Sequence, residues 1–282
     1  MNRFSRSPVS RPSFWLWAVL LLFATTACNQ ADEPAPPPKA ADLAANPPPR
    51  EDKLVVFAAA SLREVFGELA IDFKNAHAGV DITFNFAGTQ ELRTQLEQGA
   101  LVDVFASADQ RHMDELVKAG RAVATVTFTR NEPVVVVAKE QVAKLESFAD
   151  LPKLERLVIG TPEVPIGRYT LQIFNKANEK LGKDFRKKLE ANVVSRELNV
   201  KQVLAKVTLG EANAGIVYRT DALAAKGQVG ILEIPAELNV IAQYPIAKVN
   251  DAAHPALAQA WLDLVLSPAG QKRLEAAGFS SP

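Results

Sequence analysis

The regular alternation of short apolar strands with amphipathic helices constrains the fold of this chain most strongly. From Leu54 onward, apolar segments of strand length alternate with segments whose apolar residues recur at helical spacing. The first three expected strands cover residues 54–58, 80–86 and 102–106, and a helix follows each of them. Because parallel strands need a crossover connection, usually a helix, this order predicts mainly parallel sheets flanked by helices.

A second alternating set follows residue 133. Its expected strands are residues 134–138, 157–160, 192–196, 214–218 and 244–249, and its helices are residues 168–181, 199–207 and 255–266. A chain of 282 residues is long enough for two ordinary domains. We therefore expect an α/β fold of two lobes connected by crossing strands. Lobe 1 would contain residues 53–133 and 222–282, and lobe 2 residues 134–221.

Residues 1–28 have the features of an export signal. Three arginines precede an apolar run at residues 14–24, and small residues lead up to Cys28. The apolar run is shorter than the roughly 20 residues that a membrane span needs. The end of the segment resembles the lipobox of bacterial lipoproteins, so we expect Cys28 to carry a lipid. A simple cleaved signal with an incidental cysteine is the alternative.

The segment after Cys28 is expected to be a tether. Residues 29–52 are rich in proline and alanine, a composition that stays extended and cannot build a core. The protein is therefore expected in the periplasm or on the outer face of the cell membrane, held there by its lipid alone. Lys plus Arg equals Asp plus Glu, at 32 each, and this charge balance argues against a nucleic-acid partner.

The sequence carries no familiar signature of catalysis or of metal binding. The motifs G-x-S-x-G, H-E-x-x-H, C-x-x-C and G-x-G-x-x-G do not occur. His77 is expected in a turn, His112 on a helix surface and His254 before a proline, so they do not suggest a shared metal site. These features favour a binding protein with no enzymatic activity, no cofactor and no cation site. An exported hydrolase and a lipoprotein that scaffolds partners are the alternatives.

Four expected helices begin directly after strands, at positions suited to an anion. These starts lie at Ser61, at Thr89, in residues 164–169 and at Asn199. The start of a helix carries unpaired backbone N–H groups and a partial positive charge. Ser61 with Glu64 predicts a capping box, and most capped helices bind nothing, so a cap without a ligand is the alternative for Ser61. In an open α/β sheet, however, such starts converge at the carboxyl ends of strands, where ligands bind.

Several motifs in the chain resemble those of the molybdate-binding proteins of ABC importers, which belong to the type II periplasmic-binding-protein family. They are F-A-A-A-S-L at 57–62, F-A-G-T at 86–89, D-V-F-A-S-A-D at 103–109, V-P-I-G at 164–167, N-V at 199–200 and G-I-V-Y at 215–218. The resemblance covers about residues 53–279. It implies a two-lobed fold that closes on a tetrahedral oxyanion, molybdate or tungstate, in a cleft between the lobes. It also implies a monomer that delivers the ion to the membrane permease of an importer.

By position, the resemblance implies five residues that hold the oxyanion through its oxygens. Ser61, Thr89 and Tyr218 would offer hydroxyl groups, whereas Ile166 and Val200 would offer backbone N–H groups. Thr89 stands where the family usually has a serine, and it adds a methyl group. Ile166 replaces a small residue, but only its backbone is needed.

A site made only of neutral donors suits an anion that stays fully ionised. A buried dianion needs hydrogen bonds to its oxygens, and each bond to a charged group contributes about 1.5–3 kcal/mol. A phosphate that keeps a proton needs an acceptor, so such a site should reject it. Sulfate is also a dianion, and a sulfate receptor of the same fold stays an alternative. An iron(III) receptor is disfavoured because the chain has only three tyrosines.

Two charged residues lie near the motifs. Asp109 would repel an anion if it pointed inward, so we expect it to cap the helix that follows. Arg168 follows the V-P-I-G turn and either lies on the surface or lends positive charge to the anion.

Overall fold

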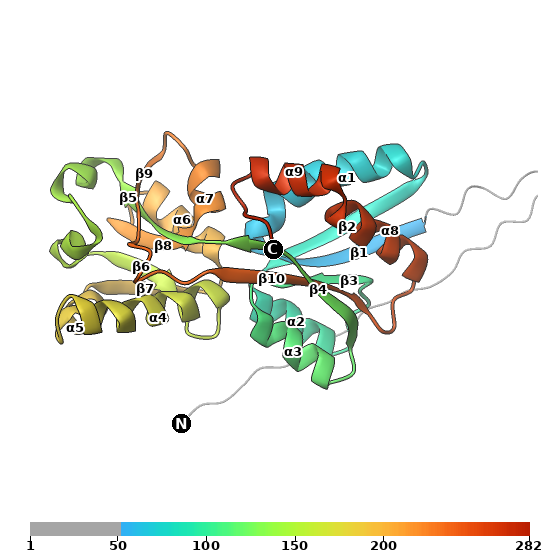
Figure 1. Cartoon of the computed structure of the whole chain (residues 1–282), viewed down its shortest axis with the longest axis horizontal. Helices are drawn as coiled ribbons and strands as arrows, with labels where there is room; N and C mark the ends of the chain where they lie inside the picture. The colour runs from blue at the N-terminus through green and yellow to red at the C-terminus, as the bar shows by residue number, and fades with distance from the viewer. Residues whose placement is uncertain (1–51) are drawn as a thin grey trace, which may run out of the picture. The chain divides into compact units, whose positions relative to one another are not determined.

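A computed structural model describes residues 52–282. The predictions for the signal segment 1–28, for Cys28 and for the tether up to residue 51 lie outside these residues. The described chain forms two five-stranded sheets, with strand orders β2-β1-β3-β10-β4 and β7-β6-β8-β5-β9. Each sheet is flanked by helices and defines one lobe (Figure 1). The predicted two-lobed α/β fold is confirmed.

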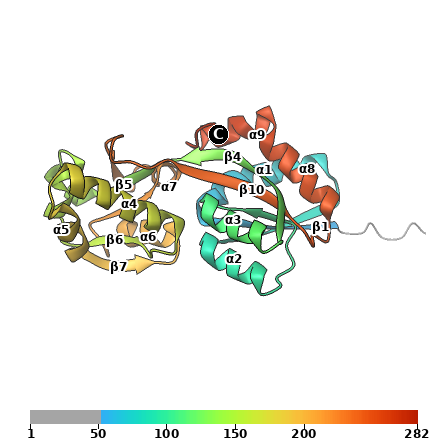
Figure 2. The same ribbon diagram turned by 60° about the horizontal axis from the view of Figure 1, so that its bottom comes forward.

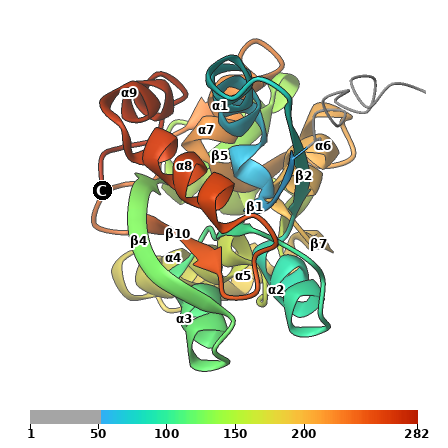
Figure 3. The same ribbon diagram turned by 90° about the vertical axis from the view of Figure 1, so that its right-hand side faces the viewer.

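The first lobe is built on the sheet that contains the first strand. Its strands are β1 (Asp52–Ala59), β2 (Val80–Ala87), β3 (Val104–Ala106), β4 (Ala122–Asn131) and β10 (Ala242–Val249), and its helices are α1 (Arg63–Ala76), α2 (Thr89–Glu97), α3 (Gln110–Lys118), α8 (Pro255–Leu266) and α9 (Pro268–Ala276). Helices α1, α8 and α9 cover one face of the sheet and α2 and α3 the other (Figure 3). Apolar side chains form a core on each face, with Phe66, Phe73 and Trp261 in contact on the first and Leu92, Phe105 and Met113 buried on the second.

The second lobe repeats this plan. Its strands are β5 (Pro133–Ala138), β6 (Leu157–Gly160), β7 (Val193–Glu197), β8 (Ala214–Tyr218) and β9 (Val229–Leu232), and its helices are α4 (Pro165–Lys180), α5 (Phe185–Ala191), α6 (Val200–Thr208) and α7 (Arg219–Ala224), with 3-10 turns at Lys139–Lys144 and Phe148–Lys153. The sheet is covered on both faces, so its central strands are buried along their length. Such strands appear in the sequence as continuous apolar runs.

One strand in each sheet runs against the other four. Strands β1, β2 and β3 are parallel, whereas β10 is antiparallel to both β3 and β4. In the second sheet β6, β7 and β8 are parallel, whereas β5 is antiparallel to both β8 and β9. The sheets are therefore mixed, although most strands share one direction as predicted. The candidate site is found at the carboxyl ends of β1, β2, β6, β7 and β8.

The two lobes are connected by two crossings of the chain. Strand β4 leads into β5 through Glu132, and the chain returns between β9 and β10. Strands β4 and β10 pair with each other in an antiparallel ladder and run side by side (Figure 2). Because β9 pairs with β5, residues 229–232 belong to the second sheet. We predicted that the chain returns to the first lobe at residue 222. In the structure it returns later, in the segment between β9 and β10.

The sequence analysis missed β4 and β9 and three short helices, α5, α7 and α9. Within β4, Val126 and Phe128 alternate with Thr127 and Thr129, a signal of period two that could have identified it. Helix α4 begins at Pro165, three residues before the predicted start, because a proline is well tolerated in the first turn of a helix. Within residues 52–282, no helix combines the length and the apolar character that crossing a membrane requires.

Candidate anion-binding site

All five residues predicted to hold the anion line one small cavity between the lobes. Its volume is about 10 Å³, far below the roughly 300–1,000 Å³ of pockets for drug-sized molecules. The lining residues are Ala59, Ala60, Ser61, Ala87, Gly88, Thr89, Ala108, Val164, Pro165, Ile166, Asn199, Val200 and Tyr218. None of these thirteen residues carries a formal charge, so the cavity offers only neutral polar groups to a ligand.

Ser61 lies where β1 ends, in the 3-10 turn η1 (Ala60–Leu62) that leads into α1. Its side chain is 3% exposed, and its Oγ lies 2.8 Å from the hydroxyl oxygen of Tyr244 on β10. The predicted capping box between Ser61 and Glu64 is wrong, because Ser61 lies inside the turn and Leu62 occupies the cap position of α1 without a side-chain bond. The hydroxyl is therefore free of any capping role.

Thr89 is the first residue of α2, and Gly88 rather than Thr89 is the cap of this helix. The Thr89 hydroxyl oxygen accepts a hydrogen bond from the backbone N–H of Ala108 at 3.2 Å. Its own proton remains available to a ligand in the cavity. Gly88 lets the second lobe approach closely, since a β-carbon at this position would lie 2.3 Å from the carbonyl oxygen of Leu198.

Ile166 and Val200 present their backbones at the starts of two helices of the second lobe. Ile166 is the second residue of α4, and the first turn-closing bond of that helix is donated later, by Arg168 N to Val164 O. Val200 is the first residue of α6, which Asn199 caps as predicted by accepting from Gln202 N at 3.1 Å. The N–H groups at such positions have no partner within their helix. Both are therefore suited to an anion.

Tyr218 ends β8 and is 1% exposed. Within the described part of the chain, its hydroxyl has no hydrogen-bond partner, although it is fully buried. Burial raises the pKa of Tyr218 well above its ordinary value, and the neighbouring Tyr244 adds to the effect, so the phenol keeps its proton. Leaving a buried donor unpaired is costly. A neutral phenol that faces a cavity without a partner is therefore a strong candidate for a ligand contact.

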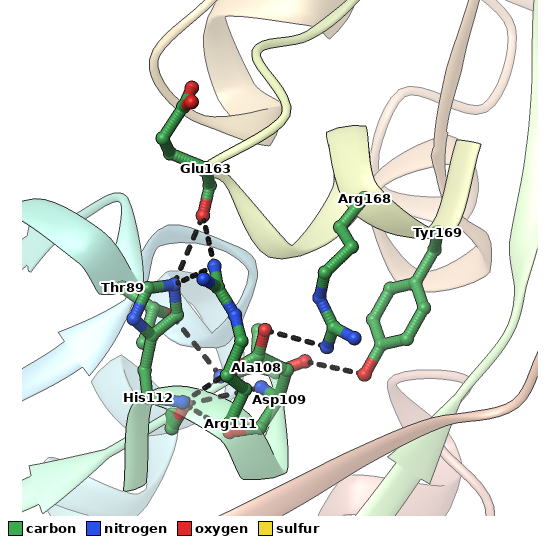
Figure 4. A network of polar contacts seen from close by, with 9 residues as sticks. Thr89, Ala108, Asp109, Arg111, His112, Glu163, Arg168 and Tyr169 are labelled. Carbon is green, nitrogen blue, oxygen red and sulfur yellow. Dashed lines mark hydrogen bonds and ion pairs between the residues drawn. The ribbon is translucent and has the colours of Figure 1, made fainter. Parts of the chain in front are cut away.

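The lobes are joined beside the cavity by polar contacts between α3 and the segment before α4 (Figure 4). The carbonyl oxygen of Glu163 accepts from the Arg111 guanidinium at 3.0 Å, and His112 Nε2 lies 3.0 Å from the same oxygen. His112 is 1% exposed, so its predicted place on a helix surface is wrong. Burial lowers the pKa of His112 and favours the neutral ring.

Arg168 and Asp109 form an ion pair between the lobes. Arg168 Nη2 lies 2.8 Å from Asp109 Oδ2, and the carboxylate is fully buried whereas the arginine side chain is 30% exposed (Figure 4). Asp109 also caps α3 as predicted, accepting from His112 N at 3.0 Å. The negative charge near the cavity is thus paired with Arg168.

A second ion pair joins the lobes through α6. Lys201, next to Val200, lies 2.7 Å from Glu64 of α1 and 2.9 Å from the buried Asp221 of α7. Burial acts to lower the pKa of Lys201, but Asp221 and Glu64 outweigh it and raise that pKa. The lobes are therefore held together by charged groups that do not line the cavity.

Comparisons with known proteins identify the family of this chain. The family described as bacterial extracellular solute-binding protein matches residues 54–280. The molybdate-binding protein ModA of Mycobacterium tuberculosis is 38% identical over 270 residues, which cover 95% of this chain and 97% of that protein. ModA of Escherichia coli is 35% identical over 239 residues, covering 82% and 90%. The solved periplasmic molybdate-binding protein of Azotobacter vinelandii shares the fold, with a TM-score of 0.71 at 20% identity, over 81% of this chain and 99% of that one.

These similarities extend over both lobes, and the resemblance first indicated by short motifs is confirmed over nearly the whole described chain. The match also begins at β1 and ends beyond α9, so it includes every strand that contributes to the cavity. The chain belongs to the family of bacterial extracellular solute-binding proteins.

Proposed function

We propose that this protein captures molybdate outside the cytoplasm and delivers it to the permease of an ABC importer. The observation that carries the proposal is the convergence of neutral donors from both lobes on one small cavity with no charged lining residue. Ser61, Thr89 and Tyr218 would bind oxygens of the ion through hydroxyl groups, and Ile166 and Val200 through backbone N–H groups. No catalytic residue and no cofactor enter this function.

The chemistry of these donors selects for a fully ionised anion. Each hydrogen bond to a charged oxygen contributes about 1.5–3 kcal/mol, so several together can offset the cost of removing a dianion from water. The starts of α2, α4 and α6 add their partial positive charges. Tungstate is expected to bind as well, because it offers the same oxygens in the same tetrahedral arrangement.

Sulfate is the second candidate ligand. The sulfate-binding protein SubI of Mycobacterium tuberculosis shares the fold with a TM-score of 0.72 at 18% identity. Relatives that are 38% and 35% identical carry the molybdate-binding name, which favours molybdate.

A thermal-denaturation experiment on the intact chain tests this function. Molybdate at 100 times its dissociation constant should raise the free energy of unfolding by about 2.7 kcal/mol, or roughly 5–10 °C in Tm. Tungstate should act similarly, whereas phosphate and a chloride control at equal ionic strength should have no effect. A shift with sulfate alone would identify a sulfate receptor, and no shift with any oxyanion would exclude the proposed function.

The ion pair between Arg168 and Asp109 should contribute to affinity without touching the ligand. In Arg168→Met, the Asp109 carboxylate is buried without its partner when the lobes are together. This cost disfavours the closed arrangement that binds the ion, so we expect molybdate affinity to fall roughly fivefold, about 1 kcal/mol. Isothermal titration calorimetry measures the change. The control is Arg273→Met, which breaks a pair with Asp72 inside the first lobe and should leave affinity unchanged. Equal affinities for the two variants would contradict this role of Arg168.

We further propose that the protein is exported and attached to the membrane through a lipid on Cys28, with residues 29–52 as its tether. The ABC permease would be its protein partner, and the binding protein itself would act as a monomer. A tether of this length allows the binding lobes to reach a permease while they remain at the membrane surface.

A further inference from the structure

We propose that Lys201 is a positioning residue for the anion, which bridges an acidic residue of each lobe and so holds three of the five anion donors in place. The inference rests on the proposed function and concerns a side chain that does not line the cavity. Lys201 is the second residue of α6, directly after Val200. Its ammonium nitrogen lies 2.8 and 2.7 Å from the two carboxylate oxygens of Glu64 and 2.9 Å from Asp221 Oδ1.

Asp221 connects Lys201 to Tyr218 within the second lobe. It is fully buried in the first turn of α7, and its Oδ2 accepts from the backbone N–H of Tyr218 at 3.3 Å. Burial raises the pKa of Asp221, and the charge of Lys201 opposes that rise. Among the ion pairs of residues 52–282, Lys201 supplies the only cation at this carboxylate. The start of α6 and the end of β8, which carry the donors Val200 and Tyr218, are therefore joined through one buried pair.

Glu64 extends this bridge to the first lobe. It is the second residue of α1, just after the turn that contains Ser61, and its side chain is 49% exposed. Helix α6 also packs against that turn. Because Glu64 and Lys201 belong to different lobes, their ion pair requires the lobes to be together. The same arrangement brings Ser61 to the donors of the second lobe, so the ion pair and the complete anion site form together.

Lys201 also stands between two like charges. Glu64 and Asp221 approach the same ammonium group from opposite lobes, and the charge of Glu64 acts to raise the pKa of Asp221. With the lysine in place, Glu64 attracts the second lobe. Without it, the two carboxylates would face each other and repel. The effect of Glu64 on closure of the lobes, and hence on anion affinity, should therefore change sign when the lysine is removed.

A double-mutant cycle tests this change of sign. Calorimetry measures molybdate affinity for the unmodified protein, Glu64→Gln, Lys201→Met and the double variant. Glu64→Gln should weaken binding about two- to fivefold in the unmodified protein, as expected for a partly exposed ion pair. Lys201→Met should weaken it roughly tenfold or more, because the buried carboxylate loses its partner and the two acids are opposed. Adding Glu64→Gln to Lys201→Met should then improve affinity about two- to fivefold. A lysine that only stabilises the second lobe would lower the free energy of unfolding without this change of sign.

Glu68→Gln is the matched control. Glu68 lies about one turn further along α1 and pairs with Arg273 inside the first lobe, at 3.5 Å. This variant should leave molybdate affinity unchanged. If Lys201→Met does not fold, the comparison of Glu64→Gln with Glu68→Gln decides the question.

Two results would overturn the inference alone. One is an equal effect of Glu64→Gln and Glu68→Gln on affinity, and the other is the same loss from Glu64→Gln with and without Lys201. Absence of molybdate binding by the unmodified protein would overturn the proposed function and the inference with it.

Discussion

Replacing Gly88 by alanine is expected to weaken molybdate binding about 5- to 150-fold while leaving the ligand-free fold intact. A β-carbon at this position would lie 2.3 Å from the carbonyl oxygen of Leu198, which belongs to the second lobe. Backbone atoms cannot move aside as a flexible side chain can, so the lobes would be held apart at the cavity. Overpacking of this kind costs about 1–3 kcal/mol, and affinity falls with the population of the competent arrangement.

The ligand-free form should tolerate the same change. Gly88 has φ −61° and ψ 138°, an extended conformation that alanine adopts without strain. The other close atoms belong to the Gln90 side chain, which can rotate away. The expected result is therefore a loss of affinity with little change in the free energy of unfolding, measured by calorimetry and by urea denaturation.

Gly67→Ala is the control for this experiment. Gly67 lies within α1, and no atom comes within 4 Å of a β-carbon placed there. Alanine in a helix interior is favoured over glycine by about 1 kcal/mol, so this variant should be more stable and bind molybdate normally. If Gly88→Ala binds as tightly as Gly67→Ala, contact between the lobes at Gly88 is not needed for binding.

The lobes and most of their elements were predictable because their signals are local. Apolar periodicity marks β1, α1 and β8 within short windows, and burial on both faces produces the continuous apolar runs of β5 and β6. Sheet order was not predictable in this way. Strand β10 lies between β3 and β4, a position set by contacts between segments far apart in the chain.

In the candidate site too, local signals predicted the residues but not the long-range contacts between them. Short motifs identified five of the thirteen lining residues, and each of these five lies at a strand end or a helix start. The contacts that hold those residues in place were missed, because Ser61 meets Tyr244 across 183 positions and Asp109 meets Arg168 across 59. The capping box failed for a related reason. Its two side chains find distant partners, Tyr244 and Lys201, which a local rule does not consider.

Removing the Tyr218 hydroxyl is expected to have opposite effects on affinity and on stability. Within the described residues this buried hydroxyl has no partner, so Tyr218→Phe should leave the ligand-free protein as stable as before or more stable. The ring and its packing against Tyr244 are kept. Binding should nevertheless weaken about 10- to 150-fold, because one hydrogen bond to a charged oxygen, about 1.5–3 kcal/mol, is lost.

Weakened affinity without a loss of stability distinguishes a residue that binds the ion from a residue that only packs in the core. If a tyrosine only fills the core, removing its hydroxyl bond lowers the free energy of unfolding of the protein and leaves its affinity for molybdate unchanged. Thr129→Val, which removes a paired buried hydroxyl, should behave in that way and serves as the control. Calorimetry with molybdate and thermal denaturation without it measure the two quantities separately. Unchanged affinity in Tyr218→Phe would remove Tyr218 from the site and leave the anion to the remaining donors.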